Sequence, residues 1–293
     1  MTYYQFVHAV ELKVKEETKG QLDVSVNAVL KNNGWMRQGI VLKERNINIS
    51  PTIYLEEYYQ RFLRGVKLET IAKEILKIYG QVRFESPMDA NFIGDYKQIK
   101  GKIVYRVINR EKNQELLEDI PYKEYLDLAI VYYLLFDSTR YGTASMMISN
   151  THLGIWEVDV EEIHRRAKEN TKVLLPYQFK TMSQTVSEMI GESVEIYEDL
   201  LYILTNKNMS YGASTILYPD CLEAIGEKLE ENYYIIPSSV NELIMVREGD
   251  APDEEELASM VREVNETQVP DEEILSDHVY YFDRIDNRLQ IVL

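Results

Sequence analysis

The feature of this sequence that most constrains the fold is a recurring order of strand, polar turn, glycine, strand and helix. Two short phrases show it: RYGTASMMISNTHL contains Gly142, and SYGASTILYPDCL contains Gly212. A third copy, VNAVLKNNGWMRQGIVLKER, turns at Gly34. An isolated hairpin leaves its apolar face exposed, and a helix laid over that face supplies the missing burial. We therefore predict an α+β fold of antiparallel hairpins, each covered by helices, in repeated ββα units.

The repeated glycines have two interpretations. Glycine adopts positive φ without a steric penalty and often marks turns or bulges in strand patterns, so these glycines can act as hairpin hinges. Alternatively, the phrase marks a ligand site that occurs twice. We favour the hinge, because a repeated packing unit already explains the recurrence.

Hydrophobic periodicity divides the whole chain into elements. Capping residues and prolines set the predicted helix starts, and glycines set several of the ends. We predict helices at 2–17, from Ser50-Pro51 to Gly65, 67–79 with Gly80 as the stop, 111–120, 159–171 with Asp159 as cap, from Pro176 to Gly191, 219–231 and 252–267. Predicted strands cover 21–30, 38–45, 102–109, the continuous apolar run 128–136, 143–149, 199–207, 213–218, 232–239, 241–248 and a closing hairpin about Asp286-Asn287. These elements group into three α+β units at 1–85, 86–190 and 191–293.

Length and composition predict a cytoplasmic protein. The chain has 293 residues, of which 45% are hydrophobic, enough to bury a core. Its longest apolar run, LAIVYYLLF, is far shorter than the roughly 20 residues of a membrane helix. The first residues lack the continuous apolar segment of a signal peptide. The single cysteine, Cys221, excludes an internal disulfide and a cysteine-based metal cluster.

The formal net charge of −17 is concentrated in residues 248–277. Such a charge repels phosphate backbones, so direct nucleic-acid binding is disfavoured. One interpretation of the acidic segment is a solvated helix face that keeps the protein in solution. The other is an acidic surface that mimics nucleic acid or docks on a basic partner.

Motifs that identify a reaction are absent from the sequence. It has no G-x-S-x-G, P-loop or dinucleotide-binding pattern, and its four histidines lack a metal-ligand spacing. We therefore predict no cofactor and no metal. His164 suits an exposed helix face or, with burial and an orienting partner, a general base. Cys221 at a helix start is either a small buried residue or a thiol that pairs with His278.

The best polar candidate is the turn in IIPSSVNELIMV. Ser238, Ser239, Asn241 and Glu242 lie between two apolar strands, after a proline that restricts the turn. One interpretation is an ordinary hairpin turn. The other is a binding rim at a sheet end, which the neighbouring turn extends with Thr205, Asn206 and Lys207. His278, in the stretch LSDHVYYFD, is a weaker addition to the same set.

Several phrases together resemble a known bacterial family. They include YLDLAIVYYLLF, ISNTHLGIWEVDVEEIHRRAKENT and YYIIPSSVNELIMV. Over nearly the whole chain they resemble an uncharacterised Firmicutes family known only as a domain of unknown function. The middle and last thirds are more distantly similar to YtpQ-type proteins, through an Ala-x-x-Asn helix end at 167–170. The Pro-x-Arg-Asp turn of those proteins is replaced here by residues 237–241, so the resemblance implies a fold and no catalytic residues.

These observations favour a binding, adaptor or regulatory module without catalysis, whose partner is another protein or a small ligand. The first alternative is an enzyme of unrecognised type that uses the polar turn at 238–242. The second is an acidic inhibitor or nucleic-acid mimic.

Overall fold

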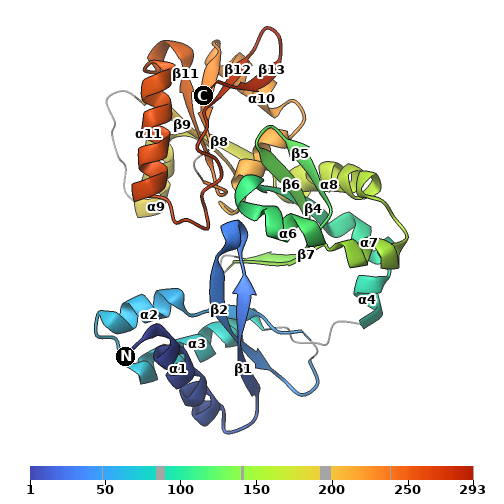
Figure 1. The fold of residues 1–293 in the computed structure, drawn as a ribbon, viewed down its shortest axis with the longest axis vertical. Coiled ribbons are helices and arrows are strands. Elements are labelled where there is room, and N and C mark those ends of the chain that lie inside the picture. Colours follow the sequence, from blue (N-terminus) through green and yellow to red (C-terminus); the bar gives the residue numbers. More distant parts are fainter. Residues whose placement is uncertain (48, 84–89, 140–141, 192–198, 238, 293) are drawn as a thin grey trace. The chain divides into compact units, whose positions relative to one another are not determined.

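The computed structural model describes residues 1–47, 49–83, 90–139, 142–191, 199–237 and 239–292 (Figure 1). By their contacts, the residues form two compact units. The first comprises 1–31 and 35–95, and the second comprises 32–34 and 96–293. The division of the sequence into three units stays a prediction.

The first unit combines a small antiparallel sheet with helices. The sheet has the order β1-β2-β3. Its elements are α1 (Tyr3–Thr18), β1 (Asp23–Leu30), β2 (Met36–Lys43), β3 (Thr52–Tyr54), α2 (Glu56–Leu63), α3 (Leu68–Val82) and α4 (Ala90–Gly94). Phe6, Val10 and Val14 recur at helical spacing on α1 and are fully buried in one cluster with residues of β2 and α3. The core of this unit is therefore built between the sheet and its helices.

Capping residues and hydrophobic periodicity in the sequence predicted most of these elements correctly. Thr2 caps α1 in a capping box with Gln5, as its position before the apolar repeat predicted. The predicted hairpin is also confirmed: β1 and β2 pair from Asp23↔Lys43 to Leu30↔Met36.

Two predicted boundaries in the first unit are wrong. A helix was expected to begin at Ser50-Pro51, but Thr52–Tyr54 forms β3 on the edge of the sheet, and α2 starts only at Glu56. The pairing partner of β3 is β2, which local propensity cannot reveal. Gly80 does not stop α3, which continues to Val82, because glycine also adopts the helical conformation.

The second unit contains two antiparallel sheets. The first has β6 at its centre, with β4 on one side and with β5 and β7 also paired to β6. Its strands are β4 (Ile103–Asn109), β5 (Tyr122–Tyr125), β6 (Leu128–Thr139) and β7 (Gly142–Met147), and the helices of this region are α5 (Tyr96–Ile99), α6 (Gln114–Asp119), α7 (Asn150–Trp156) and α8 (Val160–Leu174). The apolar run that predicted a buried strand lies in β6, which explains why it does not alternate.

The other sheet of this unit has six strands in the order β13-β12-β10-β11-β9-β8. Its strands are β8 (Tyr177–Thr181), β9 (Leu201–Asn206), β10 (Tyr233–Ile236), β11 (Leu243–Arg247), β12 (Tyr280–Asp283) and β13 (Arg288–Ile291). The helices of this region are α9 (Met182–Ile190), α10 (Cys221–Leu229) and α11 (Glu254–Thr267), with a 3₁₀ helix, η4, at Gly212–Leu217. Figure 1 shows α11 along this sheet, and its buried Leu257 and Val261 cluster with Tyr234 and Val246.

The α+β class is confirmed, and two of the three copies of the repeated phrase form hairpins. The third does not. Residues 213–218 were expected to form a strand, but they lie in and just after η4. The segment between Pro176 and the helix before Gly191 also differs from the prediction, since Tyr177–Thr181 is the edge strand β8.

The glycines of the two similar phrases occupy different environments. Gly142 opens β7 opposite Thr139, beside the predicted turn residues 140–141, which lie outside the described residues. Gly212 opens η4 directly after Tyr211, which has a left-handed φ of 51°. Its position is packed: a Cβ there would lie 2.7 Å from the Asn206 amide nitrogen and closer still to Thr205 Oγ1 and the Asn241 carbonyl oxygen. Glycine is needed there for close approach.

Candidate functional site

The residues of the predicted polar turn gather around Gly212. The Thr205 hydroxyl, at the end of β9, donates to the Asn241 carbonyl at 2.7 Å. The Asn241 side-chain oxygen accepts from the Tyr211 amide at 3.1 Å. Asn206 is buried; its side-chain nitrogen donates to the Ser210 carbonyl at 2.8 Å, and its oxygen accepts from the Asn208 amide. These groups therefore hydrogen-bond to one another and hold the chain around Gly212.

The other members of the turn are divided between core and surface. Ser239 is buried, and its hydroxyl accepts from the Asn241 amide at 3.0 Å. Burial raises the pKa of the Glu242 carboxyl, while a hydrogen bond from Ser239 opposes that shift. Lys207 is exposed, and Ser238 lies outside the described residues. That these residues bind a ligand stays a prediction.

His278 lies in a different hydrogen-bond cluster, centred on Asp127. The Asp127 carboxylate accepts from the Ser276 hydroxyl at 2.5 Å and from the Tyr280 hydroxyl, and His278 Nδ1 lies 3.1 Å from it. Ser276 is fully buried and already donates to Asp127, so this geometry does not prepare a serine nucleophile. The cluster connects the residue before β6 to the loop that enters β12.

Cys221 and the histidines do not form a reactive pair or a metal site in the described part of the chain. Burial raises the pKa of the Cys221 thiol to about 12, so the thiol stays protonated at neutral pH. No group of three or more His, Cys, Asp or Glu side chains is placed to hold a metal ion among the described residues. His164 lies elsewhere, on α8, at the wall of a pocket.

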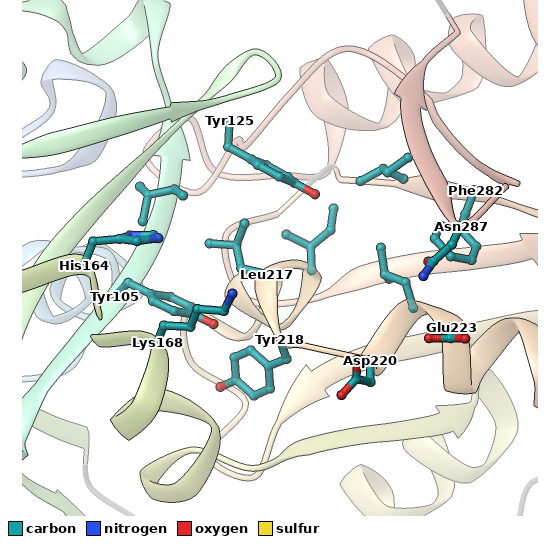
Figure 2. A pocket seen from close by; sticks show the side chains of 14 residues that line it. Tyr105, Tyr125, His164, Lys168, Leu217, Tyr218, Asp220, Glu223, Phe282 and Asn287 are labelled. Carbon is teal, nitrogen blue, oxygen red and sulfur yellow. The ribbon is translucent and has the colours of Figure 1, made fainter. Parts of the chain in front are cut away.

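The pocket has a volume of about 350 Å³ and lies within the second unit. This is at the lower end of the range for small-molecule sites. Aromatic and aliphatic side chains from β4, β12 and η4 form much of its wall, and Figure 2 shows how they face its interior. The lining residues are Tyr105, Tyr125, Ile130, His164, Lys168, Ile216, Leu217, Tyr218, Asp220, Leu222, Glu223, Phe282, Asn287 and Leu289.

Polar groups without internal partners face this pocket. Tyr105 is 1% exposed, and within the described residues its hydroxyl has no hydrogen-bond partner. Burial raises the pKa of Tyr105 far above its usual value, so the hydroxyl keeps its proton. Lys168, Asp220 and Glu223 are exposed at the pocket, and they form no ion pair or side-chain hydrogen bond with any described residue. An unsatisfied buried hydroxyl is costly and rare in folded proteins.

His164 lies at the same wall, beside the Tyr132 hydroxyl. It lies four residues before Lys168 on α8, so both side chains are on one face of the helix. Burial lowers the pKa of His164, and the nearby charges of Lys123 and Lys168 lower it further, against an opposing effect of Glu161. Tyr132, whose hydroxyl stays protonated because burial raises its pKa, lies 3.0 Å from His164 Nδ1. When the Tyr132 hydroxyl donates to Nδ1, a neutral His164 ring carries its proton on Nε2.

The charges around the pocket are separated by sign. Figure 2 shows His164, Tyr105 and Lys168 on one side of the pocket, and Glu223, Phe282 and Asn287 on the other. Asp220 lies directly before α10, and Glu223 lies on the first turn of α10. Donors and a positive charge therefore lie on the α8 side, and carboxylates lie on the α10 side.

Comparison with protein families finds a match over nearly the whole chain. The profile of a family of unknown function, DUF5688, matches residues 3–284. The chain belongs to this family. Neither the comparison with curated proteins nor that with solved structures finds a match. The similarity to YtpQ-type proteins stays a prediction.

The Ala-x-x-Asn segment at 167–170 suggested the similarity to YtpQ-type proteins. In this DUF5688 protein, it connects α8 to β4. The Asn170 side chain donates to the carbonyl oxygens of Lys100, at 2.8 Å, and of Ile103, at 2.9 Å. Ala167 is fully buried, and its carbonyl accepts from the Thr171 hydroxyl at 2.6 Å. These contacts position α8, and with it His164 and Lys168.

The acidic segment of the DUF5688 chain has many local partners. Asp253 caps α11, Asp250 pairs with Arg247 at 2.5 Å, and Glu254 accepts from the Tyr234 hydroxyl. Glu248 accepts from Tyr281, and Asp277 accepts from the Asn265 side chain. Carboxylates at a helix start also interact favourably with the helix dipole. These contacts give much of the segment a structural role. No described helix of the protein is both long and apolar enough to span a lipid bilayer.

Sequence reasoning missed the pocket almost entirely. It singled out His164 and Cys221 near this region, but it did not connect Tyr105, Lys168, Asp220 or Phe282. These residues are separated by long stretches of chain, and each has an ordinary local pattern. The one available signal was the unusual tyrosine content, 22 tyrosines against 7 phenylalanines, which does not tell which hydroxyl lacks a partner.

Proposed function

We propose that this protein is a binding module without catalysis that holds a small organic ligand in the pocket at Tyr105. The observation that carries the proposal is the buried Tyr105 hydroxyl, which has no partner among the described residues and faces the pocket. A ligand atom that hydrogen-bonds to this hydroxyl removes the cost of leaving it unsatisfied. The location that accompanies this role is cytoplasmic, as composition predicted.

The separation of charges indicates the chemistry of the ligand. An acidic or strongly accepting group fits beside Lys168 and the Nε2–H of His164, and a basic or donating group fits beside Asp220 and Glu223. The rings of Tyr105, Tyr218 and Phe282 favour a flat or apolar body between those ends. A small aromatic molecule that carries both a carboxylate and an amine is therefore the best first probe.

The alternatives have less support from the geometry. An enzyme site at 238–242 would need free polar groups, but Ser239, Asn241 and Thr205 are engaged with one another. An acidic decoy would need free carboxylates, and several of those in 248–277 have structural partners. Neither alternative gains an observation comparable to the unpartnered Tyr105 hydroxyl.

The test is ligand binding to matched variants, measured by thermal shift and by saturation-transfer NMR with a panel of aromatic acids, amines and amino acids. Lys168→Met is expected to weaken binding of carboxylate-bearing compounds by about 10- to 100-fold, because it removes a charge-assisted hydrogen bond. Lys172→Met is the control, since Lys172 lies one turn further along α8, is exposed, and does not line the pocket.

Tyr105→Phe gives a second, sharper readout. It removes only the unpartnered hydroxyl, so the free protein is expected to gain about 1 kcal/mol or more of stability. The same change is expected to weaken ligand binding, so the two effects have opposite signs. If no compound of the panel binds, or if Lys168→Met and Tyr105→Phe bind as well as the wild type, the proposal is wrong.

A further inference from the structure

A second polar site lies on the other side of Tyr105 and Tyr218, around a buried arginine. Arg106 is in the middle of β4 and is only 7% exposed. Its side chain leaves the strand on the face opposite to those of Tyr105 and Val107, because side chains alternate along a strand. A guanidinium stays charged at every physiological pH, so this strand carries a permanent buried cation.

The guanidinium is stacked between two tyrosine rings. Its central carbon lies 3.9 Å from the ring centre of Tyr133 and 3.9 Å from that of Tyr211. Tyr211 directly precedes Gly212, so the packing that requires glycine also places this ring. A cation–π contact is stronger when the cation is desolvated, as it is here. The two rings cover the faces of the guanidinium and leave its N–H edge for hydrogen bonding.

The hydrogen-bonding edge is incompletely satisfied. A guanidinium has five N–H donors, and Arg106 uses some of them for hydrogen bonds to Ser145 Oγ, at 2.9 Å, and to the Tyr133 side chain. No carboxylate of the described residues lies within ion-pair distance of it, although the chain carries 49 acidic side chains. A buried charge that finds no counter-charge among the described residues is costly, and an anion from solution offsets that cost.

A small cavity adjoins the guanidinium. It has a volume of about 10 Å³ and is lined largely by polar side chains, among them Arg106, Thr171, Asn206, Ser210 and Ser214. The Ser214 hydroxyl accepts from the Val107 amide at 3.2 Å, which leaves its own proton free to donate. This space accommodates about one water molecule or one monatomic ion. It is too small for phosphate, sulfate or an organic acid.

We infer that the Arg106 cavity binds a single small monovalent inorganic anion, with chloride as the abundant member of this class. The anion takes hydrogen bonds from the free guanidinium N–H groups and from the Ser214 hydroxyl. It supplies the counter-charge that the described residues do not place beside Arg106. The site is separate from the ligand pocket and does not depend on the proposed function.

The test compares sodium chloride with sodium gluconate at equal ionic strength, with thermal unfolding of the full chain as the readout. Equal ionic strength is needed because a net charge of −17 makes any salt stabilising. Chloride is expected to raise the unfolding midpoint by a few degrees above that in gluconate, because it binds only the native state. Arg106→Met is expected to abolish this difference, and Arg106→Lys to reduce it.

Two further measurements complete the design. Arg262→Met is the matched control: it removes a positive charge from an exposed position of α11 and is expected to keep the chloride effect. Wild-type crystals soaked in sodium bromide need no variant to fold, and the bromide anomalous signal is expected beside the Arg106 guanidinium. Equal stabilisation by chloride and gluconate, or bromide crystals in which this position shows only water, overturns the inference.

Discussion

At the scale of single residues, tyrosine hydroxyls act mainly as internal connectors. A tyrosine can bury its ring while its hydroxyl remains in water. Instead, the Tyr218 hydroxyl donates to the Leu175 carbonyl at 2.6 Å, and that of Tyr233 to the Leu222 carbonyl at 2.8 Å. Tyr280 donates to Asp127 in the same way. Against this pattern, the Tyr105 hydroxyl stands out because it is fully buried and yet lacks a partner among the described residues.

A prediction at this scale concerns Gly212. Gly212→Ala is expected to destabilise the protein by about 1 to 3 kcal/mol or more, because its Cβ would overlap groups of Thr205, Asn206 and Asn241. The measurement is urea unfolding followed by circular dichroism.

The matched control is Gly154→Ala in α7. No atom lies within 4 Å of a Cβ built there, and alanine is favoured over glycine in a helix, so a gain of about 0.5 to 1 kcal/mol is expected. Equal effects of the two substitutions would show that Gly212 is not held in a tight packing site.

At the scale of elements, the outer edge of β4 is satisfied by side chains. β4 pairs only with β6 among the described strands, so the backbone groups on its other edge have no partner strand. The Tyr105 amide donates to Thr171 Oγ1 at 3.1 Å, and the Val107 amide donates to Ser214 Oγ at 3.2 Å. Two hydroxyls, one from α8 and one from η4, therefore take the place of a neighbouring strand. η4 thus contacts this edge through a side chain and not through strand pairing.

A prediction at this scale concerns the charge network of α8. Hydrogen bonds from Arg165 lower the pKa of Glu162 to about 2, with Arg166 and Tyr96 contributing and partial desolvation opposing. Because the native pKa lies below the usual value of 4.5, this contribution to stability is present above about pH 4.5 and is lost as the pH falls toward 2. Over that window, the unfolding midpoint of the wild type is expected to fall more steeply than that of Glu162→Gln.

Glu169→Gln serves as the comparison. Glu169 pairs with the same two arginines, but its side chain is 53% exposed against 26% for Glu162, so a smaller difference is expected. The measurement is a series of thermal melts from pH 2 to pH 7. Parallel curves for Glu162→Gln and wild type would contradict the predicted linkage.

At the scale of the whole molecule, the first compact unit has a core of its own. Its buried cluster contains residues of α1, β2, α3 and their neighbours, all before residue 80. The second unit has separate clusters, such as that of Leu257 and Val261 on α11. A unit with its own core is expected to unfold as a cooperative segment.

The corresponding prediction uses Phe6→Ala, which empties a fully buried position of the first unit and is expected to cost about 3 to 5 kcal/mol. Hydrogen exchange measured by mass spectrometry is expected to lose protection in peptides from 1–31 and 35–83, with little change in those from 96–293. Leu257→Ala is the reciprocal control and is expected to reverse the pattern. Loss of protection throughout the chain for both variants would show a single cooperative unit.

What the sequence by itself determined are the features that depend on near neighbours along the chain. Thr2 and Asp159 cap their helices as predicted, the apolar run 128–136 forms a buried strand, and Gly191 ends α9 with a positive φ. Each results from periodicity or capping within a few residues. The α+β class follows from the same local patterns.

Only the tertiary structure decided the short edge strands, η4 and the two cavities. The strands at 52–54 and 177–181 form because a partner strand lies beside them, and local propensity does not specify that partner. The pocket at Tyr105 and the Arg106 cavity each combine residues from β4, α8 and the η4 region, and β4 and η4 are more than a hundred positions apart in the chain. Their properties depend on which polar groups find partners after packing, and that is a matter of distance in space.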